Sequence, residues 1–363
     1  MSNPFGVRPV VNANATVTVL GGSLMPAPVL QTMNDAAAHF VDLPELHDRV
    51  GERLAELTHN EAGCVTSGAA AAITLAVAAC ISDRSQAFPT GAEIVMFASQ
   101  RNGYDYSARF LGARVVEIGP SVDELRTALS RRPACVLWFA GSHYAAGALP
   151  IDDVVRLAGE VSVRPGISGV PVIVDAAAQI PPVATLWRFT RDVGADAVIV
   201  SGGKGLRGPQ ASGLVLGRRW LVDGVRTHSS PNHEIGRGMK VGKEELLGLL
   251  AAVEWTLQQD EDALLASYER IVAYWVDGLR DLPGVTVERG YPSEAGQPHG
   301  RAILRLTRPR DEVVAALWDL DPRIAVGTYG VPEDAIALNP QTLQPGEEQL
   351  VLDALLALLG RDR

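Results

Sequence analysis

The strongest constraint on the fold comes from short, unbroken apolar runs that alternate with segments of helical pattern. The runs lie between residues 92 and 219 and read "AEIVMFASQ", "ACVLWFAGS", "VPVIVDAAAQ", "DAVIVSGGK" and "SGLVLGRR". Amphipathic segments such as "SVDELRTALSRR" lie between them, and Ser121 and Glu124 have the spacing of a capping box at a helix start. Strands that are apolar throughout are typical of parallel sheets with helices on both faces. The pattern therefore predicts an α/β fold.

The pattern also divides the chain into three regions. Residues 1–55 are predicted to be an N-terminal arm with helices near 29–40 and 44–57. Residues 56–255 hold the alternating runs and form the large domain. Residues 256–363 mix short strands with helices, which favours a small α+β domain.

Composition excludes several classes of function. The chain has 363 residues, with 32 Lys and Arg against 42 Asp and Glu, a net charge of −10. This balance argues against a general nucleic-acid-binding protein, which needs a basic face. Cys64, Cys80 and Cys135 lack the spacing of a metal site and are predicted to be buried thiols. The histidines also lack metal-ligand spacing, so we expect no metal.

The N-terminus gives no signal of export. It has no basic segment followed by an apolar one, and the longest apolar stretch, residues 69–81, is too short to span a bilayer. We therefore expect a cytoplasmic protein with no membrane segment.

Polar residues stand where several apolar runs end. Lys204 follows one run and has Gly202, Gly203 and Gly205 around it, and Asp175 ends another in "VIVD". In parallel sheets, function gathers at the carboxyl ends of the strands. A desolvated lysine can form a Schiff base with an aldehyde, and the glycines are expected to leave room for a flat ligand.

The other two pieces fit pyridoxal phosphate. A carboxylate at Asp175 could keep the pyridine nitrogen protonated, which makes the ring an electron sink. "TSGAAAAI", residues 66–73, is a small-residue turn entering a helix, where backbone N–H groups and Ser67 suit a phosphate that Ser201 could also reach.

Each piece also has an ordinary structural explanation. A lysine after glycines can be a solvated turn residue, Ser67 can be a helix cap with nothing bound, and Asp175 can begin a turn. Their order along the chain, with the phosphate turn first, then the aspartate, then the lysine, favours a cofactor site.

Several longer segments of the sequence resemble those of a known family. "SGGKGLRGPQASGLVLGRR" (201–219), "GRGMKVGKEELLGLLAAVEW" (236–255), "TSGAAAAI" (66–73) and "VVNANATVTVLGGS" (10–23) resemble the selenocysteine-synthase-like branch of the fold-type I pyridoxal-phosphate enzymes. This branch includes seryl-tRNA selenium transferase and D-glucosaminate-6-phosphate ammonia-lyase. The resemblance covers most of the chain. It implies a mainly parallel seven-stranded sheet, a small C-terminal domain, and pyridoxal 5'-phosphate as cofactor.

The resemblance also implies roles for individual residues. Lys204 is the Schiff-base lysine and general acid/base, and Asp175 partners the pyridine nitrogen. The residues expected around the cofactor are Ser67, Gly68, Ala69, Gln100, Arg101, His143, Asp175, Gln179, Ser201 and Lys204. The residue stacked on the ring is left open among Gln100, Arg101 and Tyr104.

Three residues are expected to bind substrate, namely Arg207, Arg237 and Tyr104. Arg207 is a candidate for a substrate carboxylate or phosphate, and Arg237 for a contact across a subunit interface. A surface role is an equal alternative for Arg237, and a locally bonded histidine is an equal alternative for His143.

The predicted reaction is α,β-elimination on a hydroxylated amino acid or aminosugar acid, with or without a phosphate, such as D-glucosaminate 6-phosphate. Its products are a 2-keto acid and ammonia. Aminotransferase, racemase and aldolase chemistry remain alternatives because the same carbanion serves all of them.

A selenium transferase acting on seryl-tRNA is a further alternative. The acidic charge and a start close to the arm "VVNANATVTVLGGS" argue against it. The family also implies a homodimer, or a multiple of dimers, with shared sites.

Overall fold

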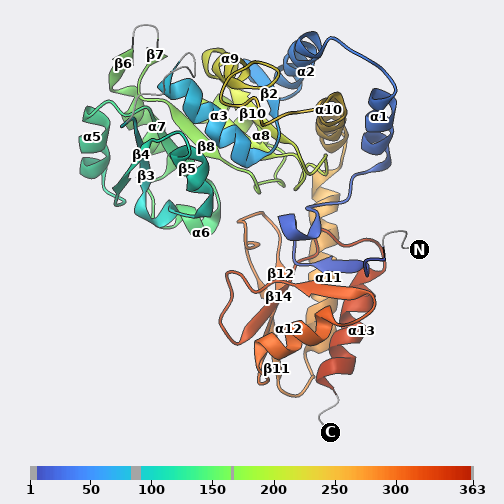
Figure 1. The fold of residues 1–363 in the computed structure, drawn as a ribbon. Helices are drawn as coiled ribbons and strands as arrows, with labels where there is room; N and C mark the ends of the chain where they lie inside the picture. Colours follow the sequence, from blue (N-terminus) through green and yellow to red (C-terminus); the bar gives the residue numbers. More distant parts are fainter. Residues whose placement is uncertain (1–5, 83–90, 165–166, 361–363) are drawn as a thin grey trace. The chain divides into compact units, whose positions relative to one another are not determined.

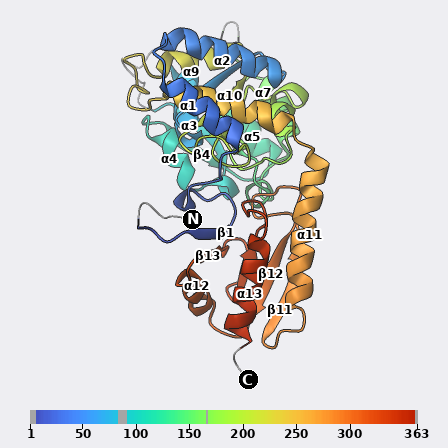
Figure 2. The ribbon, with the colours of Figure 1, turned by 90° about the vertical axis from the view of Figure 1, so that its right-hand side faces the viewer.

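The computed structural model describes residues 6–82, 91–164 and 167–360. They divide into two units, one from residue 25 to 258 and one that joins residues 6–24 to residues 259–360 (Figures 1 and 2). This division differs from the ranges expected from the sequence, because the first strand belongs to the C-terminal unit and the first two helices belong to the sheet unit.

The larger unit is built on a seven-stranded sheet, as predicted. The strands lie in the order β2 (Ala62–Thr66), β10 (Gly213–Gly217), β9 (Ala197–Ser201), β8 (Val172–Asp175), β5 (Cys135–Phe139), β3 (Glu93–Phe97) and β4 (Arg114–Ile118). Strand β10 is antiparallel to both of its neighbours, and the other adjacent pairs are parallel. The mainly parallel sheet is therefore confirmed, with β10 as its antiparallel member.

Helices cover both faces of this sheet (Figure 1). One face packs against α2 (Leu43–Leu57), α5 (Val122–Ser130), α7 (Ile151–Gly159), α8 (Thr185–Trp187) and α10 (Lys243–Leu257). The opposite face packs against α3 (Ala69–Ile81), α4 (Tyr106–Arg109) and α9 (Arg219–His228). Successive residues of β9 enter opposite cores, so every position of the strand must be apolar.

Helix α3 explains the alanine-rich run after the small-residue turn. Ten of its residues, from Ala72 to Ile81, are buried. A helix that is apolar on all sides belongs in a protein interior. Its small side chains also allow close approach, since a Cβ added to Gly224 of α9 would lie 2.6 Å from the Cβ of Ala79.

The remaining elements of the sheet unit are short, apart from the helix α1 (Ala27–Ala37) that packs along α10. They are η3 (Ala98–Gln100), η4 (Gly103–Asp105), α6 (Ser142–Ala145), η5 (Arg188–Asp192) and the antiparallel pair β6 (Ser162–Arg164) with β7 (Ile167–Ser168).

The C-terminal unit has its own core. Strands β11 (Val285–Gly290), β12 (Arg301–Leu306) and β14 (Ala335–Leu338) form an antiparallel sheet, and β1 (Val10–Ala13) pairs in parallel with β13 (Arg323–Val326). Its helices are η1 (Thr18–Leu20), α11 (Glu261–Leu279), α12 (Arg310–Trp318) and α13 (Glu347–Leu359). The predicted α+β character of this region agrees with these elements.

Candidate functional site

Lys204 lies in the turn that leaves β9, three residues beyond the end of the strand. Its side chain is half-buried. The Gly202 N–H donates to the Ser212 carbonyl at 2.9 Å, and the Arg207 N–H donates to the Lys204 carbonyl at 2.9 Å. The loop is thus fixed at both ends, and the lysine has a defined position at the carboxyl edge of the sheet.

The glycines around Lys204 are needed by the protein's own packing. A Cβ at Gly202 would lie 2.0 Å from the Ser212 Oγ, and a Cβ at Gly205 would lie 2.0 Å from the Ile180 carbonyl oxygen. At Gly203 the nearest atom would be a main-chain Cα at 2.5 Å. The expectation that these glycines leave room for a flat ligand is therefore wrong, because protein atoms occupy that room.

Asp175 ends β8, next to β9, and its side chain is buried. The residue is 7% exposed, and its Oδ1 accepts a hydrogen bond from the Ala177 N–H at 2.8 Å. Burial raises the pKa of the Asp175 carboxyl to about 6, while the Ala177 N–H and the positive charge of Lys204 act to lower it. The Ala177 N–H and Lys204 thus do not fully offset the effect of burial on the pKa of this carboxyl. A cationic group placed beside Asp175 would favour the ionised form of the carboxyl.

The start of α3 is the third component. Gly68 precedes the helix with a φ of 131°, and no side chain caps this helix end. Thr66 Oγ1 donates to the Gly68 carbonyl at 3.0 Å, which holds the turn. Ser67, Gly68 and Ala69 are all partly exposed here. An uncapped helix N-terminus presents N–H groups and a positive dipole end, which suits a phosphate.

Strand β10 joins these components. Its first residue, Gly213, pairs with Ser201 of β9 on one side and with Thr66 of β2 on the other. A Cβ at Gly213 would lie 2.4 Å from the Gly68 carbonyl carbon, so β10 packs directly under the start of α3. The lysine strand and the strand leading to the helix are two strand spacings apart, about 10 Å.

Two of the three residues considered for ring stacking already have protein partners. Gln100 is fully buried, and its amide bonds to the main chain of Phe139. Arg101 forms ion pairs with Asp105 and Glu117. Tyr104, in contrast, is 53% exposed.

His143 and Gln179 also lie at the carboxyl edge. His143 is on α6, directly after β5, with its ring centroid 3.9 Å from that of Tyr144. The Tyr144 ring in turn lies 5.5 Å from that of Phe139, so aromatic rings follow the end of β5. Gln179 follows Asp175 in a turn and is half-buried, with its carbonyl accepting a 2.7 Å hydrogen bond from Thr185.

The two arginines expected to bind substrate differ in their surroundings. Arg207 is in the lysine loop with a left-handed φ of 55°, and its guanidinium lies 5.3 Å from the ring centroid of Trp255 on α10. Arg237 is in the segment after α9 and is half-buried. Its N–H donates to the Glu234 carbonyl at 2.9 Å. Sequence reasoning missed Trp255 as a partner because the two residues are 48 positions apart.

The three cysteines are buried thiols, as predicted, and burial raises the pKa of Cys64 to about 12. Among the described residues, no helix has the length and apolar character needed to cross a membrane. The same part of the chain has no group of three His, Cys, Asp or Glu residues placed to hold a metal ion.

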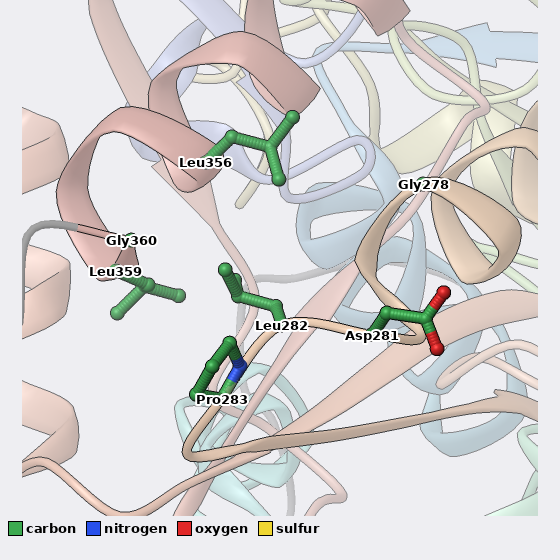
Figure 3. A pocket seen from close by; sticks show the side chains of 7 residues that line it. All are labelled: Gly278, Asp281, Leu282, Pro283, Leu356, Leu359 and Gly360. Carbon is green, nitrogen blue, oxygen red and sulfur yellow. The ribbon is translucent and has the colours of Figure 1, made fainter. Parts of the chain in front are cut away.

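A cavity of about 300 Å³ lies in the C-terminal unit, between the ends of α11 and α13 (Figure 3). Leu282, Leu356 and Leu359 are among its lining residues, and Asp281 is the one charged residue among them. None of the residues predicted from the sequence lines it.

The comparisons with known proteins first establish the class. A solved structure of D-glucosaminate-6-phosphate ammonia-lyase matches with a TM-score of 0.80 and 28% identity, over 98% of this chain and 96% of that one. Serine palmitoyltransferase from Sphingomonas wittichii matches with a TM-score of 0.63 and 15% identity, over 97% and 88% of the chains, which supports the fold alone. The fold is that of the fold-type I pyridoxal-phosphate enzymes.

Sequence relatives then identify the branch. The chain is 33% identical to a 5'-C-glycyluridine monooxygenase-decarboxylase from Streptomyces, over 98% of this chain and 91% of that protein. It is 30% identical to the D-glucosaminate-6-phosphate ammonia lyase of Salmonella typhimurium, over 97% and 95%. An L-seryl-tRNA(Sec) selenium transferase from Serratia proteamaculans is 26% identical over 69% and 56%. No protein-family model matches the chain. The chain belongs to the selenocysteine-synthase-like branch.

Proposed function

We propose that this protein is a pyridoxal-phosphate-dependent lyase that eliminates the β-hydroxyl group of a hydroxylated amino acid or aminosugar acid. The observation that carries the proposal is the pair of Lys204 and Asp175 at the ends of adjacent parallel strands, with the carboxyl buried. The similarity to D-glucosaminate-6-phosphate ammonia lyase supports this reaction and suggests D-glucosaminate 6-phosphate as a substrate.

The residues at the edge of the sheet fit the cofactor. Asp175 would hold the pyridine nitrogen in its protonated form. Burial raises the pKa of this carboxyl, and a protonated ring nitrogen beside it would stabilise the ionised carboxylate. The uncapped start of α3, with Ser67, Gly68 and Ala69, would hold the phosphate together with Ser201. Gln179 would lie near the ring hydroxyl. When bound, pyridoxal phosphate supplies an electron sink for a carbanion at Cα.

Lys204 would carry out the proton transfers. Its amine would hold the aldehyde of the cofactor and, when free, would accept the proton from Cα of the substrate. The Cα–H bond breaks first, and the bond between Cβ and oxygen breaks as the hydroxyl leaves with a proton as water. The released enamine takes up water to give a 2-keto acid and ammonia. Positioned acid–base groups of this kind contribute roughly 10²–10⁴-fold to rate.

Arg207 and Arg237 are the proposed anion-binding residues. The Trp255 ring holds the Arg207 guanidinium beside the lysine loop, and a planar guanidinium suits a carboxylate or phosphate. Tyr104 is the third proposed substrate contact, since its exposed side chain follows β3.

A second candidate reaction is decarboxylation. The relative with 33% identity is named as a monooxygenase-decarboxylase, so breaking the bond from Cα to the carboxylate, with release of CO₂, is a second way to form the carbanion at Cα. Decarboxylation is not among the reactions predicted from the sequence.

The test is an assay of the purified protein, loaded with pyridoxal phosphate, with D-glucosaminate 6-phosphate and a panel of D- and L-hydroxyamino acids. Ammonia, 2-keto acid and CO₂ are measured together without a keto-acid acceptor. Equal amounts of ammonia and 2-keto acid from one substrate support the lyase. Release of CO₂ without 2-keto acid supports the second candidate. Binding without any of these products contradicts both.

We further propose a homodimer, or a multiple of dimers, and a cytoplasmic location. The sheet unit exposes large apolar side chains on α1, after α1 and around α4, namely Leu30, Phe40, Val41, Tyr104, Tyr106 and Phe110. These side chains are the ones we propose for the interface between subunits. Light scattering that gives a monomer with full activity would contradict the oligomer.

A further inference from the structure

The carboxyl ends of β3 and β5 lack strand pairing to each other in the described structure. The two strands pair at Ile94 with Cys135 and at Val95 with Val136. On its other side, β5 remains paired with β8 as far as Phe139, which lies opposite Asp175. The end of β5 thus has a strand neighbour on one side only. This end lies opposite Asp175, the proposed partner of the ring nitrogen.

The side chain of Gln100 fills the missing position. Its Nε2 donates to the Phe139 carbonyl at 3.1 Å, and its Oε1 accepts from the Phe139 N–H at 3.0 Å. The residue is 0% exposed. A primary amide carries a donor and an acceptor like a peptide group, so this side chain makes the two bonds that a neighbouring strand would make.

Phe139 transmits this constraint to both sides. The next residue, Ala140, donates its N–H to the Asp175 carbonyl at 2.9 Å, which ties the end of β5 to the end of β8. The chain then turns into α6, where the Tyr144 ring packs 5.5 Å from the Phe139 ring. A shift at Phe139 would therefore move both the aspartate strand end and the aromatic segment.

A second contact joins the same segments. A Cβ added to Gly147 would lie 2.5 Å from the Cβ of Ser99, the residue before Gln100. The segment after α6 is thus packed closely against η3, and Gln100 supplies the polar bonds between η3 and the end of β5.

We propose that Gln100 is a positioning residue that, through the main chain of Phe139, sets the placement of Asp175 and of the His143–Tyr144 pair toward the cofactor. The sequence had suggested a direct cofactor contact for Gln100. This inference rests on the proposed function, since it needs a cofactor at the edge of the sheet.

The test compares Gln100→Met with a matched control at the opposite edge of the same sheet. Methionine has nearly the same shape but removes both hydrogen bonds to Phe139. The control is Asn60→Leu, because the Asn60 amide donates to the Leu186 carbonyl at 2.8 Å and accepts from the Thr190 hydroxyl at 2.5 Å, just before the amino end of β2. Both variants remove a bridging amide without adding charge.

Each protein is titrated with pyridoxal phosphate, and the Kd, the visible circular dichroism of the bound cofactor and the melting temperature are recorded. We expect Gln100→Met to raise the Kd by about tenfold or more and to change the visible dichroism, since small displacements cost roughly up to 10²-fold in such sites. Asn60→Leu is expected to lower the melting temperature and leave both cofactor signals as in the wild type.

The proposal is overturned if Gln100→Met lowers the melting temperature like the control and leaves the Kd and the dichroism unchanged. Failure of the wild type itself to bind pyridoxal phosphate would contradict the proposed function instead. If Gln100→Met does not fold, Gln100→Asn takes its place, because it keeps a neutral amide that is one CH₂ group too short to make both bonds to Phe139. Wild-type cofactor signals in that variant would equally overturn the proposal.

Discussion

Replacing Asp175 by asparagine should remove a pH-dependent contribution to the stability of the cofactor-free protein. The pKa of the Asp175 carboxyl is raised from its ordinary 3.8 to about 6, first of all by burial. The folded state therefore binds the proton more tightly than the unfolded state. The stabilisation is present at low pH and is lost as pH rises from about 4 to about 6.

The magnitude follows from this difference. Roughly two pH units between the folded and unfolded pKa correspond to about 3 kcal/mol in the free energy of unfolding. Asparagine does not titrate. The free energy of unfolding of the wild type minus that of Asp175→Asn should therefore fall by this amount between pH 4 and pH 7, then stay level.

Urea unfolding at a series of pH values measures this difference. Asp196→Asn is the matched comparison, because burial also raises the pKa of Asp196 to about 6, at the amino edge of the same sheet. In the cofactor-free protein, the free energy of unfolding of the wild type minus that of each variant should fall as pH rises. Bound pyridoxal phosphate should abolish the fall for Asp175 alone, since a protonated ring nitrogen favours the ionised carboxylate.

Two results would refute this reasoning. If the wild type and Asp175→Asn keep a constant difference from pH 4 to pH 7 without cofactor, burial does not hold the carboxyl in its neutral form. If bound cofactor alters the Asp196 difference as much as the Asp175 difference, Asp175 is not the partner of the ring nitrogen.

Three further substitutions test the site. Lys204→Ala should abolish the Schiff-base absorbance of the protein-bound cofactor and lower activity by at least roughly 10²–10⁴-fold, and turnover near the wild-type rate would exclude Lys204 as the base. Gly213→Ala should weaken cofactor binding by about tenfold or more, because the new Cβ would collide with Gly68, and an unchanged Kd for pyridoxal phosphate would show that the helix start does not hold the phosphate. Trp255→Leu removes the cation–π contact to Arg207, worth about 0.5–2 kcal/mol. It should raise KM for an anionic substrate several-fold with little change in kcat, and an unchanged KM would separate Arg207 from substrate binding.

The architecture could be predicted from the sequence because each strand is apolar on both faces. This feature shows as an unbroken apolar run within a few consecutive residues. The uninterrupted apolar character of β8 and β9 already requires cover on both sides. Pairing between distant segments has no such local signal. The parallel pairing of β1 with β13 joins residues more than 300 positions apart, so the local pattern predicted an arm but not its partner in the C-terminal unit.

Side-chain partners were less predictable than side-chain positions. The Ser121 and Glu124 capping pattern is half realised, since Ser121 accepts from the Glu124 N–H at 3.5 Å while the Glu124 carboxylate bonds to the Gly119 N–H at 2.6 Å. In the same way, Gln100 lies at the predicted strand end but bonds to the main chain of Phe139. Which donor a polar group finds depends on the spacing of neighbouring strands, and the linear sequence does not contain that spacing.

The antiparallel strand β10 has a consequence for how this protein can vary. Thr66 and Ser201 are 135 positions apart in the chain, yet a single residue, Gly213, is paired in register with both. The pairing of β2, β10 and β9 therefore sets the distance between Thr66 and Ser201. The helices that connect the other strands do not set it. Insertions or deletions in those connecting segments can reshape the rim around the site, and with it the choice of substrate, while the distance from lysine to helix start stays the same.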